Sequence, residues 1–268
     1  TIGRRQRQMC IRDRYIVNRF FIFNLIYMDP LSQGTVGAAF AQSIANKNNI
    51  FKIGFIGFLA GMTPDLDVLI QSSTDPILSL EYHRQFTHSL FFIPFGSLIF
   101  AILIFPLFKS SLSLKTVYFA SFLGYATHGL LDACTSYGTQ LFWPFSNERI
   151  SWNNISIVDP LFTIPILIFL IIAVKTKKKT FSFFGIGWII FYLTLGYVQY
   201  ERALSAAIEL ATMRGHNADR LTIKPSFGNL ILWKSIYQHK ETFYVDAIRT
   251  VQSSTCLLYT SPSPRDTL

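Results

Sequence analysis

The chain has 268 residues, half of them hydrophobic and only 15% charged, whereas about 25% of the residues of an average soluble domain are charged. This composition excludes a disordered chain and a basic nucleic-acid-binding domain, so no nucleic-acid partner is inferred. The net charge of +9 owes more than half of its size to six arginines and one aspartate within residues 1–27. A membrane protein is the interpretation that the composition favours.

The two ends of the chain differ from the middle. Residues 1–14 are rich in arginine, and residues 255–268 end in a Ser/Pro run without periodicity. Both resemble translated sequencing adapters, so we expect 1–27 to be a non-native leader, 255–268 to be an artefactual tail, and Met28 to be the natural start. The alternatives are a basic arm with a flexible tail, and a genuine apolar anchor at 15–27.

Six apolar stretches follow in chain order. Leu31–Ala45 and Ile53–Pro64 are short and rich in small residues, which suits close helix packing. The other four approach the ~20 residues that span a bilayer: Leu90–Phe108, Thr116–Ala133, Val158–Val174 and Phe181–Tyr200. The sequence therefore predicts a mainly α, multi-pass membrane helical bundle with four clear spans and two short N-terminal membrane helices.

Charge predicts how this bundle is oriented. The turns after the first, third and fifth stretches hold eight lysines and no acid: Lys47, Lys52, Lys109, Lys115, Lys175, Lys177, Lys178 and Lys179. Short lysine-rich loops stay cytoplasmic. We therefore expect a multi-pass membrane protein, with the lipid bilayer as a partner and the acids and histidines on the outer, periplasm-like face.

The chain changes character after Tyr200. Glu201–Gly215 has helical periodicity, and LTIKP, NLILWKSIYQ and ETFYVDAIRT have the pattern of short strands. We expect a membrane-embedded metal-binding domain over 28–200, followed by a small soluble α+β appendage over 201–254.

Histidines and aspartates cluster around three short motifs, PDLD, HRQFTHS and HGLLD. His128 and Asp132 are four residues apart, which places both on one helix face. Three histidines and three aspartates form a mixed nitrogen and oxygen set that suits zinc, with manganese or iron as alternatives. The six candidates are numerous enough for two ions: Asp65, Asp67, His83, His88, His128 and Asp132. Asp29 and Asp159, each followed by proline, fit helix caps as well as ligands.

The chemistry that this set supports is hydrolysis of a phosphoester by metal-activated water. Arg84 would neutralise developing charge, and Glu81 or one aspartate would carry the proton. The substrate would be a phospholipid or another phosphoester of lipid or envelope origin. The alternative is a non-catalytic metal-binding membrane protein that senses, regulates or transports.

Five segments together resemble the bacterial inner-membrane metal-dependent hydrolase family of YdjM and YbcI type: MDPLSQGTVGAAFAQS, AGMTPDLDVL, EYHRQFTHSLFFIP, GYATHGLLDACTSYGTQLFWPFS and WNNISIVDPLFTIP. The resemblance implies a multi-pass inner-membrane hydrolase that is distantly similar to zinc-dependent phospholipase C and zinc-dependent single-strand nucleases. Carried over by motif, it implies the same six ligands. Some members of the family have a histidine in the first helix, where this chain has Asp29 and Gln33.

Overall fold

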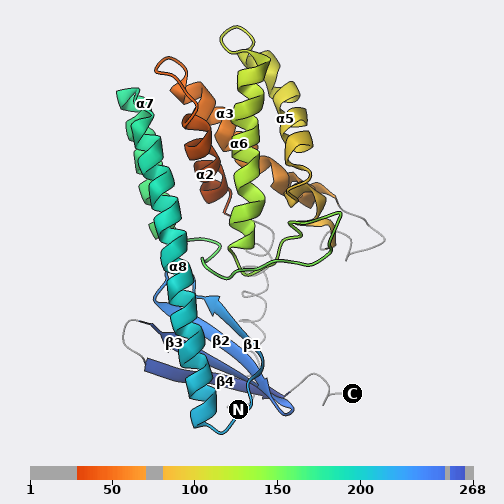
Figure 1. Ribbon diagram of the computed structural model, residues 1–268, viewed down its shortest axis with the longest axis vertical. Helices are drawn as coiled ribbons and strands as arrows, with labels where there is room; N and C mark the ends of the chain where they lie inside the picture. The colour runs from red at the N-terminus through yellow and green to blue at the C-terminus, as the bar shows by residue number, and fades with distance from the viewer. Residues whose placement is uncertain (1–28, 71–80, 251–253, 263–268) are drawn as a thin grey trace, which may run out of the picture.

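The computed structural model describes residues 29–70, 81–250 and 254–262, so the predicted leader 1–27 and Met28 lie outside the described residues. The α-helices are α2 (Pro30–Gln42), α3 (Ile50–Met62), α5 (Ile93–Phe108), α6 (Leu114–Ala133), α7 (Pro160–Thr176) and α8 (Thr180–Met213). Two 3₁₀ helices, η1 (Thr63–Leu69) and η2 (Phe86–His88), lie between α3 and α5. A sheet of four strands follows α8 (Figure 1).

Proline and aspartate mark where two of these helices begin. Asp29 caps α2 by accepting a hydrogen bond from the Leu31 amide, and Asp159 caps α7 by accepting from the amides of Leu161 and Phe162. A proline follows each cap, where its missing N–H costs no hydrogen bond. Helix capping therefore explains the presence of both aspartates, and neither is needed as a metal ligand.

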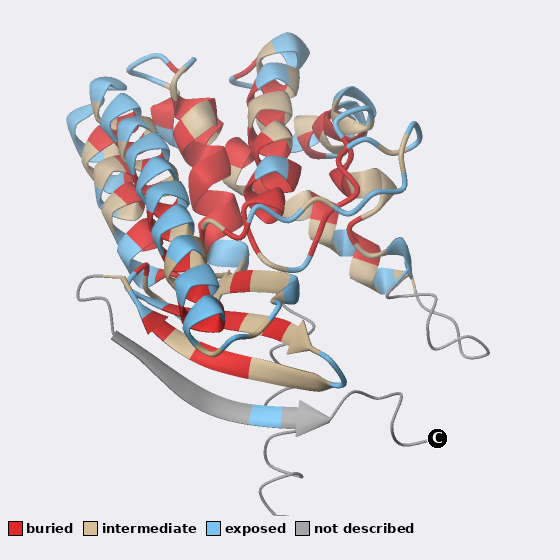
Figure 2. Ribbon diagram, turned by 60° about the horizontal axis from the view of Figure 1, so that its bottom comes forward, coloured by how far each residue is buried: buried red, intermediate tan, exposed pale blue. Residues whose placement is uncertain are grey.

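Glycines let α2, α3 and α6 pack closely in the middle of the molecule. A Cβ atom added at Gly37 would lie 2.5 Å from the Gly57 carbonyl oxygen, and one at Gly124 would overlap the same oxygen. Figure 2 shows buried residues concentrated on the central helices, while the outer helices expose long strips. The three central helices form the scaffold that holds the polar side chains described below.

The predicted bundle of four membrane spans is wrong. Among the described residues, one helix, α8, is both long and apolar enough to cross a membrane. Helices α5 and α7 are apolar but have only 16 and 17 residues, about 24–26 Å at 1.5 Å per residue. Each begins later than expected because a proline near its first turn sets the start. Helix α6 has 20 residues but carries buried polar side chains, including His128 and Asp132.

The separate helix predicted at Glu201–Gly215 is instead the C-terminal part of α8. Helix α8 runs unbroken for 34 residues, about 51 Å, because no proline or glycine interrupts residues 197–213. Gly215 follows the helix with φ of 67°, a left-handed conformation typical of helix ends. The C-terminal part of α8 thus lies beside the sheet rather than within the helical bundle (Figure 1).

The sheet is antiparallel throughout, in the order β1 (Asp219–Pro225), β2 (Leu232–His239), β3 (Thr242–Arg249) and β4 (Ser254–Pro262). The first three strands coincide with the three predicted ones. β4 pairs with β3 inside the predicted tail 255–268. This pairing does not test where the segment comes from, so the domain boundaries and the artefactual origin of the ends stay predictions.

Candidate metal centre

Three elements bring the polar motifs together at the end of α6 nearest the sheet. η1 continues directly from α3 and carries Asp65 and Asp67, and η2 carries His88. The chain of η2 lies against α6 so closely that a Cβ atom at Gly129 would overlap the His88 carbonyl oxygen. His128 and Asp132 occupy the face of α6 that this contact covers, and both are fully buried.

Four of the six predicted ligands converge on one point. The ligand atoms of Asp65, His88, His128 and Asp132 all lie within 4.8 Å of one another. The Nε2 atoms of the two histidines are 2.9 Å apart, and Asp65 Oδ1 lies 3.4 and 3.3 Å from them. Ligands held at ~2.0–2.2 Å by a tetrahedral ion lie about 3.3 Å from one another. The spacing therefore matches the first coordination sphere of a zinc-sized cation.

The hydrogen bonds of the two histidines direct their lone pairs at this point. His128 Nδ1 lies 2.5 Å from the Gly61 carbonyl oxygen. His88 Nδ1 lies 2.9 Å from Thr87 Oγ1, whose hydroxyl donates to Asp67 Oδ2. A carbonyl oxygen only accepts, and the Thr87 hydroxyl accepts from His88 because its own proton is donated to Asp67. Each Nδ1 therefore carries the proton in a neutral ring, and each Nε2 presents its lone pair. Partners of this kind commonly orient histidines that bind metals.

Burial and charge give an independent reason to place a cation here. Asp65 Oδ1 and Asp132 Oδ2 are buried and accept no hydrogen bond from any residue that the structure describes. Asp65, Asp67 and Asp132 bring three carboxylates to the cluster against the single guanidinium of Arg84. With neutral imidazoles, as metal ligands require, two negative charges remain among these residues, and a divalent cation would balance them. The residues present therefore fit a divalent metal ion.

The acid–base equilibria of the cluster agree with this need for positive charge. Burial acts to lower the pKa of His88, but the carboxylates of Asp132, Asp65 and Asp67 outweigh it and hold this pKa well above its ordinary value. Burial acts to raise the pKa of Asp65, yet His128 and His88 hold it well below its usual range. The carboxylates favour a proton on His88 for the same reason that they would attract a metal ion.

The other two predicted ligands, Asp67 and His83, form an outer pair. Asp67 Oδ1 lies 2.7 Å from His83 Nδ1, while Asp67 Oδ2 accepts from the Arg84 amide at 3.0 Å and from Thr87 Oγ1 at 2.9 Å. Asp67 thus contacts the side of His88 opposite the cluster. In this arrangement, Asp67 and His83 support the four converging side chains.

Arg84 lies inside the site rather than at its mouth. Its side chain is 4% exposed, its Nε lies 3.2 Å from Asp132 Oδ2, and its guanidinium sits over the Tyr137 ring at 4.9 Å. Its backbone has a φ of 61°, a left-handed conformation that costs a residue with a side chain about 1–2 kcal/mol. Glu81, in contrast, is exposed, and its carbonyl oxygen accepts a hydrogen bond from Arg149.

Two contributors to the site have little or no sequence signal. Gln33 on α2 is buried and donates to Asp132 Oδ1 at 2.5 Å, so it orients this carboxylate through its amide group. The Gly61 carbonyl is a backbone group, which no residue pattern reveals. The sequence signal for Gln33 is that a polar side chain stands within an apolar stretch of small residues, where polar groups are usually functional.

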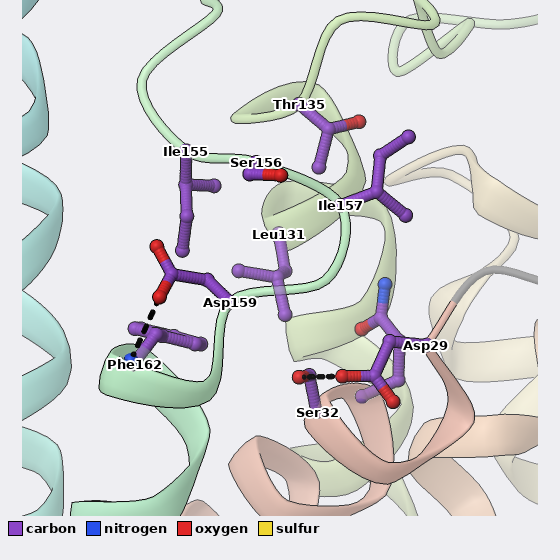
Figure 3. A pocket seen from close by; sticks show the side chains of 10 residues that line it. Asp29, Ser32, Leu131, Thr135, Ile155, Ser156, Ile157, Asp159 and Phe162 are labelled. Carbon is purple, nitrogen blue, oxygen red and sulfur yellow. Dashed lines mark hydrogen bonds between the residues drawn. The ribbon is translucent and has the colours of Figure 1, made fainter. Parts of the chain in front are cut away.

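Gln33 also lines a small pocket beside the site (Figure 3). Figure 3 shows Asp29 with Ser32 on one side of it, and Asp159 bonded to the Phe162 amide on the other. The cavity measures only about 10 Å³, which is room for roughly one water molecule. This pocket is too small to receive a substrate.

Comparison with known proteins places the chain in a family. Over 106 residues, which are 39% of this chain, it is 29% identical to the "Uncharacterized protein YfhP" of Bacillus subtilis (strain 168), and the match spans 32% of that relative. No solved structure matches. The model of the YdjM inner membrane protein family matches residues 28–203. Since this match covers well over half of the chain, the protein belongs to the YdjM inner membrane protein family.

Proposed function

We propose that this chain is a membrane-bound, metal-dependent hydrolase that acts on a phosphoester of lipid or envelope origin. The observation that carries the proposal is the convergence of Asp65, His88, His128 and Asp132 with Arg84 beside them. A divalent ion bound there would lower the pKa of a coordinated water molecule and polarise a phosphoryl oxygen. Zinc suits the two nitrogen and two oxygen donors, with manganese and iron as alternatives.

The protein's own residues would divide the remaining work. Arg84, which already contacts a carboxylate of the cluster, would bind an anionic oxygen of the substrate. Asp65 is 21% exposed and His83 is 22% exposed, whereas the other three converging side chains are fully buried. The substrate would therefore approach past these two residues. His83, held by Asp67 at 2.7 Å, is placed to accept a proton there, and Glu81 could pass it to solvent.

A direct test combines metal analysis with turnover. Elemental analysis of the purified protein should find about one divalent ion per chain. Bis-p-nitrophenyl phosphate and short-chain phospholipids would be offered before and after treatment with a chelator. Hydrolysis that requires the metal and returns when it is added back would support the proposal. A protein without stoichiometric metal, or hydrolysis indifferent to the chelator, would contradict it.

One observation favours the alternative of a non-catalytic metal protein. Four donor side chains converge, and they would complete the coordination of a tetrahedral zinc ion, as is typical of structural sites. An octahedral manganese or iron ion would keep two positions open on the same four ligands. Replacing the native ion with cobalt distinguishes a closed four-ligand site from one with open positions. Tetrahedral cobalt absorbs visible light far more strongly than six-coordinate cobalt. A tetrahedral spectrum unchanged by phosphate ligands would favour sensing or regulation.

We further propose that the lysine-bearing end of the helices faces the cytoplasm. The turns between α2 and α3, α5 and α6, and α7 and α8 lie together at the end of the molecule opposite the sheet (Figure 1). Short lysine-rich turns stay on the cytoplasmic side. With α8 crossing the bilayer and the exposed apolar faces of α5 and α7 immersed beside it, the metal centre would lie near the periplasmic surface.

A further inference from the structure

A long groove runs beside the metal centre between η1 and α5. It has a volume of about 600 Å³, which falls within the ~300–1,000 Å³ of pockets that hold small ligands. Thr63, Leu66 and Asp67 of η1, together with Ile70 just after it, line one wall. The side chains of α5 that point the same way line the other wall.

The two ends of the groove differ in polarity. At one end, Asp67 and Thr87 line it, and both of these residues contact His88. Away from this end, Ile99, Leu103 and Leu107 line it and are 54%, 73% and 77% exposed. A ligand that fits would place a polar group near the metal centre and extend an apolar chain along α5.

The length of the apolar part matches one leaflet of a membrane. The α5 residues that line the groove run from Gly96 to Leu107, about 16 Å at 1.5 Å per residue. A bilayer core is ~30 Å thick, so the acyl chains of one leaflet fill roughly half of it. An acyl chain therefore fits the groove in both polarity and length.

We propose that this groove holds one acyl chain of a phospholipid whose phosphate lies beside Asp65. Leu66 forms the rim between the two sites: it lines the groove and is 58% exposed, while its neighbour Asp65 directs Oδ1 into the metal cluster. The proposal rests on the proposed function, since it names the substrate class of the same centre. It makes the substrate a membrane lipid that enters sideways from the bilayer.

The test uses a lipid that cannot be turned over. The probe is a phosphatidic acid analogue with a phosphonate headgroup and a photoreactive diazirine at the end of one acyl chain, added to the purified full-length protein with its metal. After illumination, mass spectrometry should find the label on the peptide that contains Leu103 and Leu107. Unlabelled phosphatidic acid should compete at least tenfold better than diacylglycerol or glycerol phosphate.

A matched pair of variants locates the site. Ile99→Trp should fill the groove and reduce labelling at least fivefold. Ile102→Trp should leave labelling unchanged, because Ile102 is equally exposed (56%) on the same helix but does not line the groove. Equal labelling of both variants, equal competition by diacylglycerol, or cross-links between two copies of the chain would overturn the proposal. Because the probe resists hydrolysis, labelling is independent of whether the protein proves to be a hydrolase.

Discussion

At the scale of single residues, spacing alone reveals part of the candidate site. His128 and Asp132 are predictable together because four residues make one helical turn, and the structure places both at the cluster. The different positions of Asp65 and Asp67 are not predictable, since they depend on a 3₁₀ turn that directs the two carboxylates apart. Tertiary packing decides that Asp65 joins the converging group while Asp67 lies behind His88.

The candidate metal centre leads to the first prediction. His128→Ala should reduce bound metal at least tenfold, because it removes one of the four converging donors. His216→Ala is the control, since His216 bonds to Tyr237 in the sheet region. Elemental analysis of both purified proteins checks the prediction. Parent-like metal in His128→Ala, or equal loss in both, would refute the site.

Arg84 should act on turnover rather than on metal binding. Arg84→Lys keeps the charge but loses the planar guanidinium group, which can donate two parallel hydrogen bonds to a phosphate. Hydrolysis should therefore fall about tenfold or more, while the metal content stays within error. Arg214→Lys is a matched control, because Arg214 also pairs with a buried aspartate, Asp246, at 2.8 Å. The measurement is the rate of hydrolysis per bound metal ion. An unchanged rate in Arg84→Lys would exclude a role for the guanidinium in turnover.

At the scale of elements, the helices are predictable in position but not in their membrane role. Each of the six apolar stretches contains a helix, because apolar runs bounded by proline and lysine have clear ends. The length of each helix depends on where its first turn can form, and this shortens α5 and α7. The absence of proline and glycine from residues 197–213 permits the uninterrupted course of α8 past Tyr200. The packing of this part of α8 against the sheet is not shown by the local pattern.

The close packing of the central helices gives a prediction at this scale. Gly124→Ala should destabilise the protein by about 1–3 kcal/mol, because its Cβ would overlap the Gly57 carbonyl and push α6 away from α3. The shift of α6 should also lower the bound metal, since α6 carries two of the four converging side chains. The midpoint of thermal unfolding in detergent measures the effect.

Gly187→Ala on α8 is the control for this experiment. A Cβ at Gly187 meets nothing within 4 Å, so the variant should be neutral or slightly more stable, as expected when alanine replaces glycine within a helix. If Gly124→Ala and Gly187→Ala unfolded at the same temperature, close packing of α3 against α6 would not limit stability.

At the scale of the whole molecule, the charge pattern and the fold agree on two distinct ends. The eight lysines lie at one end of the helices, and the metal centre and the sheet lie toward the other (Figure 1). Because α8 is about 51 Å long, it exceeds a bilayer core of ~30 Å by enough to carry the sheet clear of the membrane. If α8 crosses the membrane, the lysine-bearing end and the sheet lie in different compartments.

The last prediction tests this orientation with two cysteines. Lys178→Cys lies in the turn before α8, and Lys240→Cys lies in the exposed turn between β2 and β3. Both would be made with Cys10 and Cys256 replaced by serine, leaving the buried Cys134. In intact cells, a membrane-impermeant maleimide should label Lys240→Cys and spare Lys178→Cys, and both should react once the cells are lysed. The reverse pattern would place the metal centre in the cytoplasm. Equal reactivity of both positions in intact cells would mean that α8 does not separate the two ends, because a crossing helix puts its two flanks on opposite sides of the bilayer.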